Sequence, residues 1–132
     1  MKTRLSAALL FLALPGAALA ANDVVVHRDP GCGCCEKWAQ ALRAKLGRTV
    51  VMRDDASRGA LQRRAGMPGT LASCHSAMVD GYLIEGHVPV ADIKRLLATR
   101  PVGVRGIAVA GMPIGSEGME VAGAARQPYA VV

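Results

Sequence analysis

The sequence predicts a single α/β domain with a β-α-β-α-β-β-α core and a Gly- and Pro-rich C-terminal extension. Three observations support this prediction. The chain has 132 residues, which is the length of one domain. Short β-branched runs alternate with segments whose apolar residues follow helical spacing, and this alternation is typical of α/β proteins. Residues 100–132 contain six glycines and three prolines and predict loops with one or two short strands.

The first half of the core predicts a βαβ unit followed by a second helix. Val24, Val25 and Val26 form a continuous β-branched run, which is typical of a buried strand. After a turn at 29–31, apolar residues follow helical spacing up to Gly47, a residue suited to a helix C-terminus. The predicted elements are, in order, a strand at 24–26, a helix at 35–46, a strand at 49–52 and a helix at 55–64.

The second half of the core predicts a hairpin and a third helix. Asp80-Gly81 lies between two β-rich runs, and this dipeptide favours a tight hairpin turn. A later segment places three apolar residues on one helical face. The predicted elements are strands at 77–79 and 82–84, a helix at 90–98 and a short strand around 107–109.

The first 20 residues have the composition of a secretory signal peptide. They contain 14 apolar residues, and Lys2 and Arg4 precede an apolar stretch at 7–14. Residues 18–20 (ALA) form a small-residue cleavage signature. The apolar stretch is shorter than the ~20 residues that a membrane span needs. We therefore expect cleavage after Ala20, export to the bacterial periplasm without membrane insertion, and a mature domain at 21–132 on which the extension, 100–132, packs.

Charge and aromatic content restrict the classes of partner. The formal net charge is +6 at pH 7, and two of the basic residues belong to the predicted signal peptide. Beyond that peptide the only aromatic residues are Trp38, Tyr82 and Tyr129. Proteins that bind single-stranded nucleic acids by base stacking need more aromatic side chains than this. We expect no nucleic-acid partner, and we expect the protein to be a monomer.

The predicted topology places all four cysteines at one end of the sheet. Cys32, Cys34 and Cys35 follow the first strand and begin the first helix, where the helix dipole favours thiolates. Cys74 and His75 lie just before the first strand of the hairpin. The second hairpin strand returns to the same end of the sheet and leads to His87. The candidate ligands at this end are Cys32, Cys34, Cys35, Cys74, His75 and His87.

Thiolates and imidazoles form a soft ligand set. Such ligands select Cu(I), zinc or iron–sulfur clusters over magnesium or calcium. Paired zinc ligands are usually separated by two to four residues, whereas Cys34 and Cys35 are adjacent. Adjacent thiolates suit several bridged ions better than one tetrahedral ion. The sequence therefore favours copper as Cu(I), with a thiolate-bridged cluster of several ions as one arrangement and zinc as an alternative.

Two methionines in the extension add thioether candidates. Met112 and Met119 lie in Gly-rich surroundings, and thioethers are soft copper ligands. The competing interpretation is that both pack on the core as apolar loop residues. Met52 and Met78 are expected in the strand core.

Four segments together resemble the CopG-like family of periplasmic copper-resistance proteins, long described as a domain of unknown function. The segments span nearly the whole predicted mature chain: CGCCEKW (32–38), SCHSAMVDGYLIEGHVP (73–89), GIAVAGMPIGSEGME (106–120) and the terminal PYAVV. The resemblance implies a thioredoxin-like fold, cysteine-centred copper binding and a role in bacterial copper tolerance. It places metal ligation on the four cysteines, with His75 and His87 as ligands or as supports of ligands. Met112 and Met119 match the Met-bearing tail of the family. Met67 stands where such sequences commonly have a smaller apolar residue before the proline, so we expect it to pack rather than to bind metal.

Two other uses of the cysteines remain open. Cys32 and Cys35 satisfy the Cys-x-x-Cys spacing of a thiol–disulfide oxidoreductase, although Cys34 between them offers competing disulfides. Thioredoxin-like exchangers typically have a cis-proline just before the hairpin strand, whereas this chain has Cys74 there. Structural disulfides are the other alternative, because they are common in exported proteins. Electron transfer between Cu(I) and Cu(II), and contact with other periplasmic copper-handling proteins, are secondary hypotheses.

Overall fold

The structure is a computed structural model that describes residues 23–55 and 58–132. The predicted signal peptide and its cleavage site lie outside the described residues. No helix in these two ranges combines the length and the apolar character that crossing a membrane requires.

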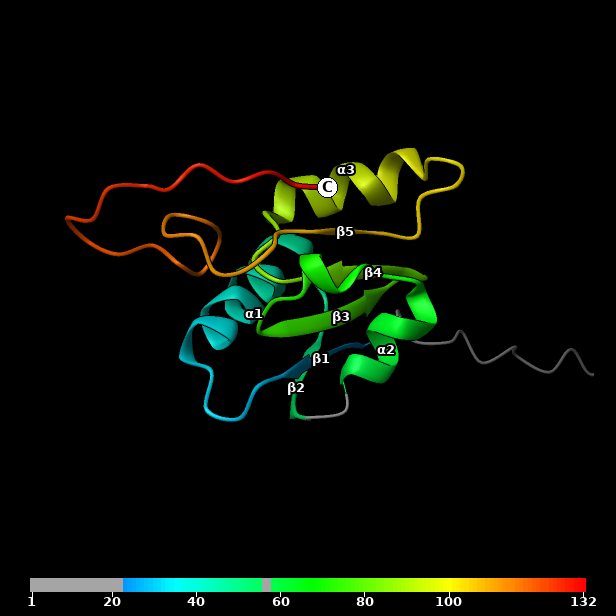
Figure 1. Cartoon of the computed structure of the whole chain (residues 1–132), viewed down its shortest axis with the longest axis horizontal. Coiled ribbons are helices and arrows are strands. Elements are labelled where there is room, and N and C mark those ends of the chain that lie inside the picture. Colours follow the sequence, from blue (N-terminus) through cyan, green and yellow to red (C-terminus); the bar gives the residue numbers. More distant parts are fainter. Residues whose placement is uncertain (1–22, 56–57) are drawn as a thin grey trace, which may run out of the picture.

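A five-stranded mixed sheet forms the centre of the domain, in the order β2-β1-β3-β4-β5 (Figure 1). β1 pairs in parallel with β2 and antiparallel with β3, while β4 pairs antiparallel with β3 and in parallel with β5. The strands are β1 (Val24–Arg28), β2 (Val50–Asp54), β3 (His75–Val79), β4 (Tyr82–Glu85) and β5 (Gly106–Ala108).

Three helices lie on the two faces of this sheet. α1 contacts α3, and α2 contacts β3. The helices are α1 (Gly33–Leu46), α2 (Arg58–Ala65) and α3 (Val90–Thr99), and a short 3-10 helix, η1 (Gly69–Leu71), follows α2. The predicted β-α-β-α-β-β-α order is confirmed, and β5 is the short strand expected near 107–109.

The core lies between α1, α3 and one face of the sheet. Side chains alternate between faces along a strand, so β1 directs Val24 and Val26 into this core. Trp38 and Leu42 of α1 and Ile93 of α3 are fully buried against them. The face therefore carries the main apolar burial of the fold.

The opposite face is only partly covered, because α2 is short and buries none of its residues completely. Met78 lies on this face and is 37% exposed. The expectation that Met78 belongs to the strand core is therefore wrong, whereas Met52 is partly buried against the core cluster. A helix of two turns does not cover the width of a five-stranded sheet.

The Asp80-Gly81 hairpin has the backbone that the sequence predicts. The φ angles are 48° at Asp80 and 90° at Gly81, and a tight two-residue hairpin of this kind needs positive φ at both positions. The turn sets the register between β3 and β4, pairing Val79 with Tyr82 and Ser76 with Glu85. The returning strand ends two residues before His87, so the turn brings that side chain back to the cysteines.

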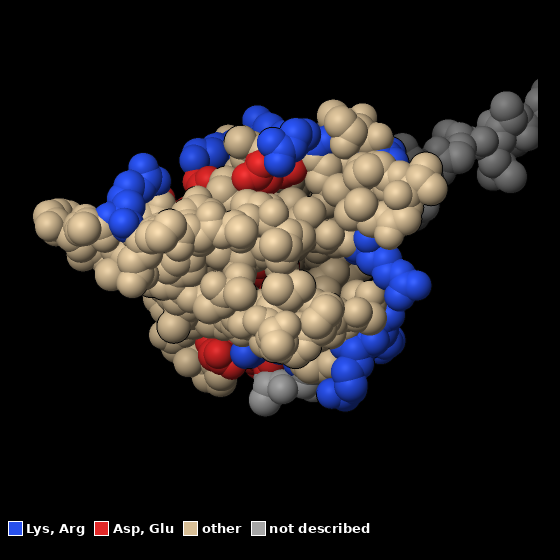
Figure 2. All heavy atoms as spheres, turned by 45° about the horizontal axis from the view of Figure 1, so that its top comes forward, with Lys and Arg blue, Asp and Glu red and all other residues tan. Residues whose placement is uncertain are grey.

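The extension forms loops that return to the sheet (Figure 1). Its last residue, Val132, exchanges two backbone hydrogen bonds with Ala108 of β5, at N–O distances of 2.8 and 3.0 Å. Figure 2 shows a broad uncharged surface on this side of the molecule, with Lys and Arg side chains at its margins. The extension is therefore tied to the sheet at its end.

Candidate metal centre

Three of the cysteines lie at the N-terminus of α1, directly after the turn that follows β1. Cys32 is the N-cap residue, and its Sγ atom accepts the backbone N–H of Cys35 at 3.3 Å. Cys32 and Cys35 are joined by a disulfide, while Cys34 and Cys74 are free thiols. The Sγ atoms of Cys32 and Cys34 lie 3.4 Å apart. This turn therefore concentrates three sulfur atoms at the positive end of a helix dipole.

Cys74 connects these sulfurs to the imidazoles. It directly precedes β3, and its Sγ lies 3.3 Å from Cys35 Sγ. The antiparallel pairing of β1 with β3 produces this contact, because it places the start of β3 beside the end of β1. Taken together, the sulfur atoms of Cys32, Cys34, Cys35 and Cys74 all lie within 4.8 Å of one another.

His75 and His87 also lie beside Cys74. The Sγ atom of Cys74 lies 3.5 Å from Nδ1 of His75 and 3.3 Å from Nε2 of His87. Cys74, His75 and His87 form a second compact group, and all three are buried. The structure thus contains two candidate ligand groups that share Cys74.

A hydrogen bond fixes the tautomer of His87. Its Nδ1 lies 2.8 Å from the backbone carbonyl oxygen of Glu117. A carbonyl only accepts, so Nδ1 carries the proton and donates it. The lone pair then lies on Nε2, which faces Cys74. Metal-binding histidines commonly donate their other ring N–H in this way.

His75 is held mainly by packing. Its ring lies 4.4 Å from the Trp38 ring, centroid to centroid, and meets the His87 ring edge-on at 4.9 Å. Its Nε2 atom is buried without a hydrogen-bond partner of ordinary geometry in the described part of the chain. Trp38 is itself fixed, since its Nε1 donates to the carbonyl of Val88 at 2.9 Å. The His75 imidazole is therefore held in place by buried, largely apolar surroundings.

Burial keeps these groups uncharged. It raises the pKa of the Cys74 thiol to about 11, with the charge of Cys34 adding to the effect. It also lowers the pKa of His75 to about 3, helped by neighbouring His87, and lowers the pKa of His87 itself. Both imidazoles are therefore neutral near pH 7, as ligands must be. The predicted lowering of thiol pKa values concerns Cys32, Cys34 and Cys35 at the helix end, and Cys74 lies outside that set.

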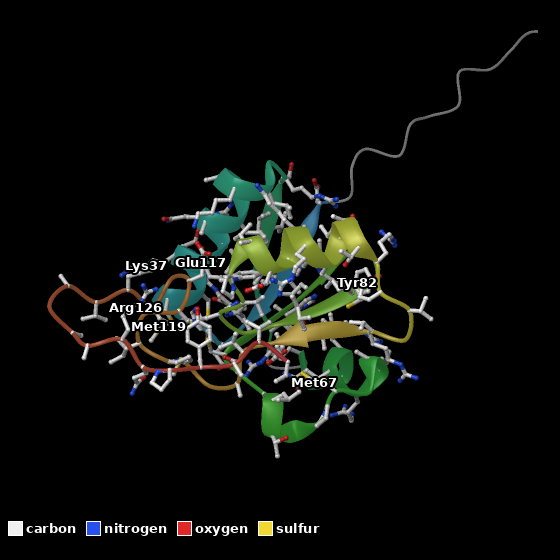
Figure 3. The ribbon with its side chains drawn as sticks, turned by 90° about the horizontal axis from the view of Figure 1, so that it is seen from above. Lys37, Met67, Tyr82, Glu117, Met119 and Arg126 are labelled. Carbon is white, nitrogen blue, oxygen red and sulfur yellow. A yellow bond between two sulfur atoms is a disulfide. The ribbon has the colours of Figure 1, made fainter. Side chains whose placement is uncertain are left out.

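The extension supports the centre through Glu117 and Gly118. The Glu117 carboxylate forms an ion pair with Lys45 of α1 and accepts the backbone N–H of Val90, at the start of α3, at 3.1 Å. Gly118 packs so closely on α1 that an added Cβ would lie 2.7 Å from the backbone nitrogen of Trp38. Figure 3 shows Glu117 and Met119 on the loop that runs beside α1.

A buried polar network lies on the other face of β3 and β4. Glu85 is fully buried and accepts the backbone N–H of Ser73 at 2.7 Å and an amide N–H of Gln62 at 3.0 Å. The Ser76 hydroxyl also donates to this carboxylate. Burial raises the pKa of Glu85, while these donors oppose the rise. The network fixes the segment that carries Cys74.

The structure brings together six of the eight residues predicted as ligands, namely Cys32, Cys34, Cys35, Cys74, His75 and His87. Met112 is 52% exposed, and Met119 is partly buried in a turn closed by its N–H bond to Ser116. Ligation by either methionine stays a prediction. Sequence reasoning missed Glu117, because neither charge nor spacing marks a residue that acts through its backbone carbonyl.

Comparison with known proteins places this geometry in a family. Residues 71–119 match the family described as protein of unknown function DUF411. Two solved structures of copper resistance protein CopG, Form 2 and Form 1, are each 42% identical to this chain, with TM-scores of 0.73 and 0.74. Both alignments cover 83% of this chain, and they cover 85% and 84% of the two CopG chains. No curated protein matches the sequence.

The matched region of the family contains Cys74, His75, His87 and Glu117. The structural alignments extend the likeness over most of the described domain. At this identity and coverage, the chain belongs to the CopG-like family of copper resistance proteins.

Proposed function

We propose that this chain is a periplasmic copper-binding protein that serves copper resistance by holding Cu(I) at the sulfur and imidazole centre. The observation that carries the proposal is the convergence of four sulfur atoms within 4.8 Å of one another, with two buried imidazoles beside them. The similarity to copper resistance protein CopG supports the same metal. Periplasmic location rests on the predicted signal peptide.

The donor set supports Cu(I) over harder ions. Thiolate and imidazole ligands suit soft metals, and the low exposure of Cys35 and Cys74 limits access of water to the bound ion. With Cys34 and Cys35 adjacent, one sulfur can bridge two ions more easily than both can reach a single tetrahedral ion. We therefore propose a thiolate-bridged cluster when all four cysteines are reduced. By holding copper tightly, the centre would limit free copper and its redox chemistry.

Loading this centre has two chemical requirements. The disulfide between Cys32 and Cys35 must be reduced before these two sulfurs act as thiolate ligands. Cys74 must also lose its proton, because burial keeps it a neutral thiol at neutral pH. Copper binding therefore releases protons and tightens as pH rises. The imidazoles need no deprotonation, and the Glu117 carbonyl holds His87 with its free lone pair towards Cys74.

The disulfide also favours a second candidate, a thiol–disulfide oxidoreductase. It links the two ends of a Cys-x-x-Cys sequence at the start of α1, where a nucleophilic thiolate gains from the helix dipole. Such an enzyme would exchange disulfides with a dithiol peptide without metal, and its activity would survive Cys34→Ser. A copper-binding protein would instead lose ions from its cluster in the same variant.

Copper analysis of the protein isolated from the periplasm is the first test. We expect several copper ions per wild-type chain, and the Cys34→Ser, Cys35→Ser double variant should lose the clustered ions. His27→Gln is a matched control, because His27 is the one histidine of the three that lies outside the centre. Its Nδ1 lies 2.8 Å from a carboxylate oxygen of Asp55. Full copper content in the double variant, or a preference for zinc over Cu(I) in equal supply, would overturn the proposal.

A further inference from the structure

We infer that Cys74, His75 and His87 form a self-contained site for one Cu(I) ion that stays available while the disulfide is closed. The inference rests on the proposed copper function and adds to it. It makes the number of bound ions depend on the oxidation state of Cys32 and Cys35.

The first argument is the division of the centre into two groups. The four-sulfur group contains both disulfide-bonded cysteines, and the Cys74, His75 and His87 group contains neither. The two groups have only Cys74 in common. Closing the disulfide removes two potential thiolates from the first group and leaves the second with all three of its donor atoms.

The second argument is the preorganisation of these three residues. Both imidazoles already lie at 3.3 to 3.5 Å from Cys74 Sγ. The Glu117 carbonyl orients His87, and Trp38 packs against His75. His75 is fully buried, yet its Nε2 atom has no hydrogen-bond partner in the described part of the chain. The atom of His75 that faces Cys74 is Nδ1, so a neutral ring with its proton on Nε2 presents the Nδ1 lone pair to an ion.

The third argument is the chemistry of the donors. One thiolate and two neutral imidazoles give a three-coordinate, soft set that suits a single Cu(I) ion. Disulfide sulfur has no ionisable proton and does not supply a thiolate, which is the sulfur form that binds metals. In the disulfide form, Cys34 is the one other free thiol. Its Sγ lies 3.4 Å from Cys32 Sγ and within 4.8 Å of Cys74 Sγ, and it belongs to the four-sulfur group, not to the histidine group.

Conversion between the two forms is a balanced two-electron exchange. A dithiol reductant attacks the bond between Cys32 and Cys35, passes through a mixed disulfide, and leaves as its own disulfide. Two thiols then form on this chain, taking the two protons of the reductant. The thiolates derived from them complete the four-sulfur group around Cys74. Further Cu(I) ions bind only after this step, so the disulfide sets the capacity of the centre.

The test is an anaerobic Cu(I) titration of the full chain against a chromogenic Cu(I) chelator, in both oxidation states. The oxidised sample is prepared without reductant, and a thiol count verifies the two free cysteines. We expect one tightly bound ion per chain in the oxidised form and more than one in the reduced form. X-ray absorption should show mixed nitrogen and sulfur ligation in the first and mostly sulfur ligation in the second.

Two variants, His87→Gln and Cys32→Ser with Cys35→Ser, separate the sites. His87→Gln should weaken the ion of the oxidised form at least tenfold, while the reduced form still binds copper through its four sulfurs. The control, His27→Gln, should change neither form. Thermal unfolding verifies that His87→Gln and His27→Gln fold. The double variant Cys32→Ser, Cys35→Ser should bind one ion with or without reductant.

The outcomes distinguish this inference from the proposed function. If the reduced protein binds several ions and the oxidised protein binds none, the one-ion site is refuted and the copper function stands. An oxidised form that binds as many ions as the reduced form also refutes the inference. If neither form binds Cu(I), the proposed function itself fails.

Discussion

Replacing Gly118 with alanine tests how strongly the extension is packed on the centre. Gly118 has a φ of +82°, and an added Cβ would lie 2.7 Å from the backbone nitrogen of Trp38 and 3.0 Å from the carbonyl oxygen of Cys34. Backbone atoms in the first turns of α1 have little freedom to move. The left-handed conformation costs an alanine about 1 kcal/mol, and overpacking against backbone adds about 2 kcal/mol.

Gly123 provides the matched control. It has a similar φ of +76° in the same extension, but an added Cβ would meet nothing within 4 Å. Gly123→Ala should therefore cost only the conformational part, about 1 kcal/mol. For a domain of this size each kcal/mol lowers Tm by about 4 °C. We expect Tm to fall by about 12 °C in Gly118→Ala and about 4 °C in Gly123→Ala.

Thermal unfolding of the reduced, metal-free protein measures this difference, and a Cu(I) titration measures its effect on the centre. We expect weaker Cu(I) binding in Gly118→Ala, because a displaced loop withdraws the Glu117 carbonyl from His87. Equal Tm values for the two variants would refute the reasoning. They would mean that the close approach of the loop to α1 contributes nothing to stability.

Three further substitutions test other parts of the fold. Trp38→Phe removes buried volume and leaves the Val88 carbonyl without the indole N–H that donates to it. Urea unfolding should therefore show that the free energy of unfolding falls by about 2 kcal/mol. A fall below about 0.5 kcal/mol would contradict this. Arg48→Met breaks the paired hydrogen bonds to Asp80 and should cost about 1 kcal/mol at pH 7. Because Arg48 lowers the pKa of Asp80, the unfolded chain binds more protons there in acid. The stabilisation by the Arg48–Asp80 pair is therefore full above the ordinary carboxyl pKa of 3.8, and it is lost as pH falls through the lower pKa of Asp80 in the folded protein. A stability difference between Arg48→Met and wild type that persists at pH 2 would argue against the pair. Glu117→Ala removes the cap of α3 and should cost about 1 kcal/mol in thermal unfolding, with most of it restored in Glu117→Gln.

Local patterns were sufficient to predict the elements of the core. Each strand and helix has its own signal, such as the valine run of β1 or the Asp80-Gly81 turn, and these signals agree with the observed order. The hairpin turn then fixes where β4 ends, so the meeting of His87 with the cysteines also followed from the sequence. Covalent neighbours and strand direction decide these features.

The disulfide and the support of His87 could not be predicted in the same way. Cys-x-x-Cys spacing allows a Cys32–Cys35 bond, but the same residues also suit metal ligation, so spacing alone does not choose between them. The contact of His87 with Glu117 depends on the path of a Gly-rich loop between residues 30 positions apart. The exposure of Met78 depends on the width of sheet that α2 leaves uncovered. All three are properties of tertiary packing.

The position of Glu117 late in the chain has a consequence for synthesis. The ribosome adds roughly 5 to 20 residues each second. Glu117 follows Cys74 by 43 residues (117 minus 74), so the last cysteine precedes the carbonyl that orients His87 by roughly 2 to 9 seconds of elongation. The closing pair of backbone bonds at Val132 forms later still. The sulfurs are thus made before the loop that covers them exists.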